Sequence, residues 1–84
     1  MTGRIDISFT PEEGAVTRML GLIERRGFAL KGLAMAAGSS PAALAIDVEA
    51  RDPLRRLDVL ARQLERLIEV RSVAISPSQT GMPA

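Results

Sequence analysis

The chain has 84 residues, enough for one small domain, and a domain of this size buries only a modest hydrophobic core. It contains no cysteine and no histidine, which excludes disulfide bonds and argues against a zinc site or histidine-based catalysis. The net charge of +1 provides no strong field for binding nucleic acid or an acidic membrane. Because 46% of the residues are hydrophobic, self-association is the expected extra source of stability.

No segment is expected to direct the chain to a membrane. The first residues run directly into an alternating pattern rather than an apolar signal core. The longest uncharged stretch, residues 32–46, is interrupted by Gly38-Ser39-Ser40-Pro41 and is too short to span a bilayer. Cytoplasmic localisation is therefore the default expectation.

Residues 4–9 alternate between polar and apolar side chains, which predicts a half-buried strand. Its inward residues are Ile5, Ile7 and Phe9. Its outward residues are Arg4, Asp6 and Ser8.

A helix is predicted from Pro11 to Arg26. Thr10 and Glu13 match a capping box, and proline suits the first helical position. Gly27 follows where a left-handed residue commonly ends a helix. The apolar face of this helix consists of Val16, Met19, Leu20 and Ile23.

Two further strands, residues 28–37 and 42–50, are predicted to form a hairpin around the turn at residues 38–41. Gly32 interrupts the first of these strands and indicates a bulge or a close backbone approach. A second helix is predicted after the cap-then-proline pair Asp52-Pro53. Its apolar stripe consists of Leu54, Leu57, Leu60, Leu64 and Leu67.

A last strand is predicted around Val70, Val73 and Ile75, followed by a disordered tail over residues 77–84. The order of strands and helices, βαββαβ, predicts an α+β fold, a ferredoxin-like two-layer sandwich occupying residues 1–76. The helices can cover only one face of the sheet. Because the second strand is apolar on both faces, we expect a homodimer formed through the sheet, although scattered exposed apolar groups remain the alternative.

No catalytic constellation is present, and the two phenylalanines are too few for base stacking on RNA. The junction of the first strand and helix is the one candidate ligand site, because backbone amides at a helix start can bind a carboxylate. Gly14 there would allow a ligand to approach closely, or it would permit tight helix packing. The residues themselves leave both interpretations open.

Two segments resemble the ACT domain of the small regulatory subunits of acetolactate synthase. The first spans Glu13 to Phe28 in the pattern Glu-Gly-Ala-Val-x-Arg-x-x-Gly-Leu-Ile-x-x-Arg-Gly-Phe. The second is Gln63-Leu64-Glu65-Arg66-Leu67-Ile68-Glu69-Val70. The likeness covers about residues 4–75, and the lack of a second domain resembles the short, single-domain form of these subunits.

The resemblance implies regulation rather than catalysis in branched-chain amino-acid synthesis. Such subunits form dimers and activate a large catalytic subunit, which carries thiamine diphosphate, Mg²⁺ and FAD. Many bind valine or a related amino acid at the dimer interface. The matching effector-binding positions in this chain are Pro11, Glu12, Glu13, Gly14 and Ala15 of one protomer and Ala29, Leu30, Lys31, Gly32 and Leu33 of its neighbour.

Two positions depart from the family pattern. Longer members carry asparagine at the position of Pro11 and another near Ala29, and both side chains are associated with effector recognition. Pro11 lacks a backbone donor and Ala29 offers only a methyl group. The expectation is therefore an activating subunit with weak or absent valine feedback. The alternatives are a free-standing ACT sensor of amino acids for another enzyme and, less favoured because the chain has no asparagine, an acylphosphatase-like hydrolase.

Overall fold

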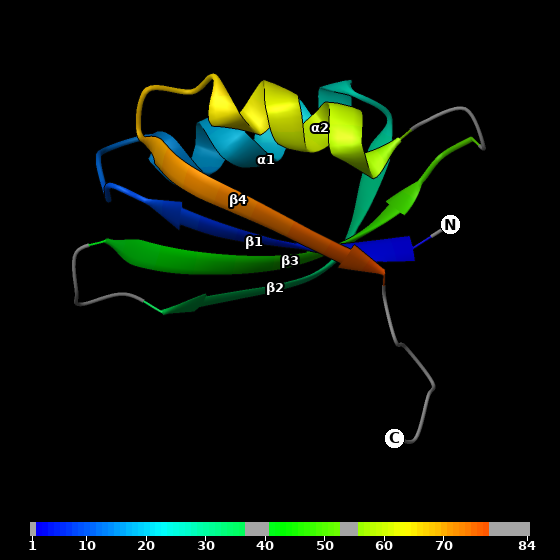
Figure 1. Ribbon diagram of the computed structural model, residues 1–84, viewed down its shortest axis with the longest axis horizontal. Helices are drawn as coiled ribbons and strands as arrows, with labels where there is room; N and C mark the ends of the chain where they lie inside the picture. Colours follow the sequence, from blue (N-terminus) through cyan, green and yellow to red (C-terminus); the bar gives the residue numbers. More distant parts are fainter. Residues whose placement is uncertain (1, 37–40, 53–55, 78–84) are drawn as a thin grey trace.

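The computed structural model describes residues 2–36, 41–52 and 56–77, and its elements follow the predicted order. They are β1 (Thr2–Phe9), α1 (Ala15–Arg25), β2 (Phe28–Ala36), β3 (Ala42–Ala50), α2 (Leu57–Glu65) and β4 (Val70–Pro77). The four strands form one sheet, and both helices lie on the same side of it (Figure 1). The predicted ferredoxin-like sandwich of two layers is confirmed.

The sheet has the strand order β2-β3-β1-β4, and all neighbouring strands are antiparallel. On the two central strands, Ile5 lies opposite Ile46 and Ile7 lies opposite Leu44. All four side chains are at most 2% exposed, so this face of the sheet forms the floor of the core. Strand alternation sends every second residue to the other face. The predicted outward residues Arg4, Asp6 and Ser8 indeed lie on that open face.

The helices supply the roof of the core. Met19 and Ile23 of α1 and Leu60 and Leu64 of α2 are at most 1% exposed. Their spacing of four residues places each pair on one side of its helix. Leu57, the first residue of α2, is only partly buried and packs beside Gly3. The described leucines of the predicted stripe thus face the core, with Leu60 and Leu64 more deeply buried than Leu57 and Leu67.

Helix α1 begins at Ala15, so the predicted start at Pro11 and the predicted capping box are wrong. The residue before the helix, Gly14, has φ 81°, which is left-handed backbone that a right-handed helix cannot pass through. Thr10 does not cap the helix. Its N–H donates to the carbonyl of Glu69 at 2.8 Å, so the hydrogen bonding between the β1 and β4 segments continues one residue beyond the end of β1. The end of the helix agrees with the sequence, since Gly27 has φ 91°.

Helix α2 also begins later than predicted. Arg56 still has extended backbone, with φ −118° and ψ 134°, and the helix starts at Leu57. Asp58 in the first turn supplies the negative charge that suits a helix amino terminus, and it accepts two hydrogen bonds from Arg56 at 2.9 and 3.1 Å. The acid at the start of this helix is thus Asp58 within its first turn, rather than the predicted Asp52 before it.

Strand β2 contains the bulge that Gly32 indicated, because its pairing with β3 shifts by one residue between Leu30 and Gly32. The shift returns the next apolar residues to the helix side of the sheet, where Leu33 lies opposite Ile46 and Met35 opposite Leu44. The helices do not cover them, and they are 56% and 50% exposed. The edge strand therefore presents two large apolar side chains to solvent.

Three predictions lie wholly or partly outside the described residues. These are the turn at residues 38–41, of which only Pro41 is described, the proposed helix start at Pro53 and Leu54, and the tail, of which only Pro77 is described. β4 extends through Pro77, one residue past the predicted end of the domain. Within the part of the chain that the structure describes, no helix is long and apolar enough to cross a membrane.

Candidate functional site

The loop between β1 and α1, residues 10–14, is an exposed turn whose backbone is closed by its own hydrogen bond. The N–H of Ala15 donates to the carbonyl of Glu12 at 3.0 Å, and Gly14 supplies the left-handed backbone that the turn requires. Pro11, Glu12 and Glu13 are exposed, whereas Ala15 is 1% exposed. The amide of Ala15 is consequently engaged within the turn.

A partly buried ion pair lies directly behind this loop, with the Arg18 side chain 48% exposed and the Glu69 side chain buried. The carboxylate of Glu69, on the connection between α2 and β4, has a side chain only 1% exposed. It accepts hydrogen bonds from Nε of Arg18 at 2.6 Å and from Nη2 of the same residue. A hydrogen bond from its own backbone N–H, together with the bond from Arg18, holds the pKa of the Glu69 carboxyl below its ordinary range. The carboxylate is therefore charged at neutral pH although it is buried.

The second predicted part of the site lies on edge strand β2, and within one chain it is far from the loop. Ala29 lies opposite Glu49, whereas Phe9, the residue before the loop, lies opposite Ala42. Glu49 and Ala42 are seven positions apart on β3, which corresponds to about 20 Å at the usual rise of a strand. Residues 11–15 and the beginning of residues 29–33 are therefore at opposite ends of the same sheet.

The bulge in β2 gives the residues of this second part different surroundings. Nζ of Lys31 lies 3.6 Å from Oε1 of Glu49 in an exposed ion pair. Gly32 lies under Asp47, since a Cβ atom at this glycine would come within 3.0 Å of Oδ2. Leu33 points to the helix side of the sheet and is more than half exposed. This segment thus offers an apolar side chain and an open strand edge rather than a set of polar groups.

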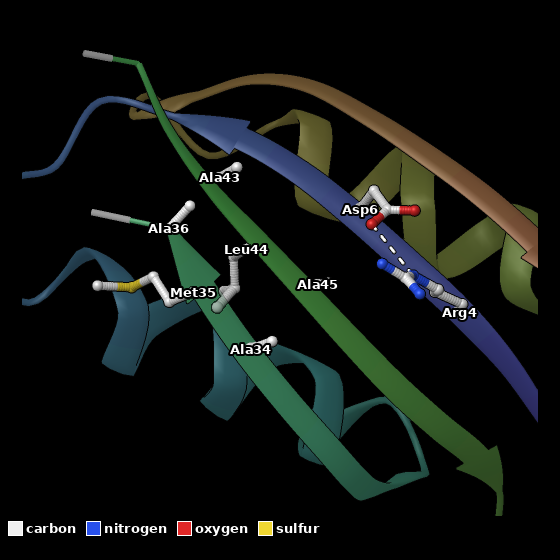
Figure 2. A pocket seen from close by; sticks show the side chains of 8 residues that line it. All are labelled: Arg4, Asp6, Ala34, Met35, Ala36, Ala43, Leu44 and Ala45. Carbon is white, nitrogen blue, oxygen red and sulfur yellow. Dashed lines mark hydrogen bonds and ion pairs between the residues drawn. The ribbon is translucent and has the colours of Figure 1, made fainter. Parts of the chain in front are cut away.

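A shallow hollow of about 320 Å³ lies on the open face of the sheet, and its lining includes none of the predicted site residues. Figure 2 shows the ion pair of Arg4 and Asp6, 3.2 Å apart, on β1 at one side of it. Strands β2 and β3 line the rest with Ala34, Met35, Ala36, Ala43, Leu44 and Ala45. Met35 and Leu44 have their side chains on the helix side by strand alternation, so alanines form most of the floor. The small side chains make this a flat surface rather than an enclosed ligand cavity.

Comparison with known proteins assigns the chain to one family. A profile of the ACT domain matches residues 11–73, which run from the β1–α1 loop into β4. The chain belongs to the ACT-domain family. It is also 34% identical to the acetolactate synthase isozyme 2 small subunit of Escherichia coli strain K12, covering 95% of this chain and 91% of that one. The small subunit of isozyme 2 from Shigella flexneri matches with the same identity and coverage. The resemblance noted in the sequence is therefore confirmed.

Solved ACT domains have the same fold as this ACT domain at much lower identity. The ACT domain of GTP pyrophosphokinase from Chlorobium tepidum superposes with a TM-score of 0.75 at 14% identity, covering 90% of this chain and 97% of that one. An ACT domain protein from Streptococcus pneumoniae gives a TM-score of 0.76, also at 14% identity, and covers 100% and 97%. At such identities the agreement concerns the fold.

Sequence reasoning about this ACT domain missed the pair of Arg18 and Glu69. Helical periodicity places Arg18 largely off the apolar face of its helix, and the sequence pattern assigns no role to the acid of Glu69. A signal was available, because Glu69 interrupts the otherwise apolar run of Leu67, Ile68 and Val70. A charged residue within such a run at the start of a strand indicates a buried group that requires a partner.

Proposed function

We propose that this ACT domain is a non-catalytic regulatory subunit that activates the large catalytic subunit of acetolactate synthase, in branched-chain amino-acid synthesis. The observation that carries the proposal is the 34% identity to a small subunit of that enzyme over nearly the whole of both chains. The composition supports it, because the chain has no histidine, the commonest general acid–base residue, and no cysteine nucleophile. In this proposal, thiamine diphosphate, Mg²⁺ and FAD belong to the catalytic partner, and the ACT domain itself binds none of them.

The proposal includes a homodimer formed along the free edge of β2. An antiparallel pairing of two β2 strands about a twofold axis sets the beginning of one strand beside the end of the other. The end of β2 lies at the loop end of the sheet, since Ala36 is opposite Ala43 and the neighbouring Ala42 is opposite Phe9. Such a dimer brings residues 29–33 of one protomer toward residues 11–15 of the other. It also covers Leu33 and Met35, which are half exposed in the single chain.

The same geometry favours weak binding of valine. A zwitterionic amino acid loses its hydration on binding and needs donors for its carboxylate and acceptors for its ammonium group. Pro11 and Ala29 carry no polar side chain, and the Ala15 amide already donates to Glu12. Each hydrogen bond that a site fails to provide costs on the order of 1–3 kcal/mol, or roughly tenfold or more in affinity. An effector is therefore bound weakly or not at all, while activation of the catalytic subunit is retained.

Two measurements test the two halves of this proposal separately. The rate of acetolactate formation by the large subunit from the same source is measured with and without this chain, and an increase is expected. Titration calorimetry with valine, leucine and isoleucine then measures effector binding, and little heat is expected. Tight binding of valine would overturn the interpretation of Pro11 and Ala29. A large subunit whose rate does not change on addition of this chain would favour a free-standing amino-acid sensor instead.

A further inference from the structure

Glu69 joins three parts of the molecule that are distant in sequence. Its carboxylate binds Arg18, 51 positions away in α1, and its carbonyl accepts the N–H of Thr10 at 2.8 Å. It lies on the short connection between α2 and β4, which emerges at the same end of the sheet as the β1–α1 loop (Figure 1). One residue therefore holds the end of β1, the first turn of α1 and the α2–β4 connection together.

The other partner of the ion pair reaches the far end of the loop. A Cβ atom at Gly14 would come within 2.9 Å of Nη1 of Arg18, so the guanidinium group lies against this glycine. Its Nε and Nη2 are meanwhile directed at Glu69. The hydrogen bond to Thr10 and the guanidinium at Gly14 thus bracket the loop at its first and last residues.

Besides these contacts, the loop is held by two local backbone hydrogen bonds, from the Ala15 N–H to the carbonyl of Glu12 and from the Arg18 N–H to the carbonyl of Gly14. The residue before α1, Gly14, makes no side-chain capping bond, and the residues between Thr10 and Gly14 are exposed. Glycine is also the residue with the greatest conformational freedom in the unfolded chain. A helix start that lacks a side-chain cap depends on contacts from elsewhere in the fold.

We propose that Arg18 and Glu69 are the positioning residues of the β1–α1 loop, and that their ion pair couples this loop to the connection between α2 and β4. A change at either end is transmitted to the other through Glu69. The connection also carries Ile68, which is 95% exposed next to the buried glutamate, so the coupling reaches a surface outside the loop. Any role of this coupling in regulation rests on the proposed function, but the coupling itself does not.

Stability alone cannot test this proposal, because a buried ion pair contributes little net stability in many proteins and breaking one is costly for any role. Residue-resolved amide hydrogen exchange of the full chain, measured by NMR, separates a local effect from a global one. Two amides report on the two ends: Ala15, which donates to Glu12, and Val70, which donates to the carbonyl of Leu67 at 3.1 Å.

The variants are Glu69→Gln, Arg18→Met and the double variant. Each single change is expected to speed exchange at both reporter amides by roughly tenfold or more relative to core amides of β3. Since the two residues act as a pair, the double variant should exchange no faster than the single ones. The matched control is Arg26→Met. Arg26 follows the last residue of α1 and donates a hydrogen bond to Oε1 of Gln63 in α2 at 3.0 Å, and its replacement should leave both amides unchanged.

Three results would overturn the proposal. Unchanged exchange at Ala15 in both single variants would mean that the loop is fixed without the pair. Faster exchange at Ala15 with no change at Val70 would mean that the ends are not coupled. Equal acceleration at every amide, β3 included, would mean that the pair only stabilises the fold. None of these measurements requires the catalytic subunit, so a failure here is distinct from a failure of the proposed function.

Discussion

The proposed dimer through β2 can be tested by replacing the two apolar side chains that this strand leaves uncovered. Leu33 is 56% exposed and Met35 is 50% exposed in the single chain. Complete burial of such a side chain stabilises by about 1.5–3 kcal/mol, so covering the exposed half contributes about 1 kcal/mol. A symmetric dimer contains two copies of each residue. Removing all four contacts with Leu33→Ser and Met35→Ser should therefore cost about 4 kcal/mol, or roughly a thousandfold in the dissociation constant.

Sedimentation equilibrium measures this constant directly. The native chain should be a dimer at micromolar concentration, and the double variant should be a monomer there. The control is Ile68→Ser, which removes the most exposed large apolar side chain described, on the α2–β4 connection rather than on β2, and should not alter the dimer. Circular dichroism establishes that the double variant is folded. A folded double variant with the native dissociation constant would refute the assignment of β2 as the interface.

Three further predictions concern stability. The side chain of Leu60 is 1% exposed, so Leu60→Ala should lower the free energy of unfolding by about 2–5 kcal/mol. The melting temperature should fall by on the order of 10 °C. A fall of only a degree or two would contradict the place of Leu60 in the core. Gly14→Ala should cost about 1–2 kcal/mol in denaturant unfolding, because the residue has φ 81° and a Cβ atom there would lie 2.9 Å from Nη1 of Arg18. The pKa of Glu69 is lowered in the folded protein, so its ionised carboxylate stabilises the fold. This contribution to the free energy of unfolding is fully present above pH 4.5, the ordinary pKa, and is lost as the pH falls through the pKa of the folded state. Melting temperatures from pH 7 to pH 2 should therefore decline less in Glu69→Gln than in the native chain, and parallel curves would count against this role of Glu69.

Most of the fold could be predicted from the sequence because its signals are periodic and local. The alternation of Ile5, Ile7 and Phe9 and the spacing of Leu60 and Leu64 each specify one buried face, whatever lies opposite. Gly32 likewise marked the bulge, since a residue without a side chain in an apolar strand indicates an irregularity.

The helix starts could not be predicted in the same way. Thr10 and Glu13 form a valid capping box in isolation, but the amide of Thr10 is held by a carbonyl 59 positions later. That contact exists only after β4 has joined the sheet, so no local pattern announces it. The partner of Glu69 is hidden for the same reason. The apolar neighbours of Glu69 indicate a buried acid, but no local pattern identifies Arg18, 51 positions earlier, as the cation that pairs with it. The parts of the site that depend on long-range contacts were thus the parts that local reasoning missed.

The alanines of the open sheet face can be changed without changing the residues that form the core. Ala34, Ala36 and Ala43 are exposed and touch no part of the core, so larger side chains can be placed there without disturbing the interior. A β-branched residue such as threonine would even suit a strand better than alanine does. The same substitution would prevent another protein surface from packing directly against this face of the sheet, because the larger side chain would lie between them. The face is therefore a suitable place to engineer variants of the domain that share the same hydrophobic core and differ only in which protein surfaces can bind to the open face of the sheet.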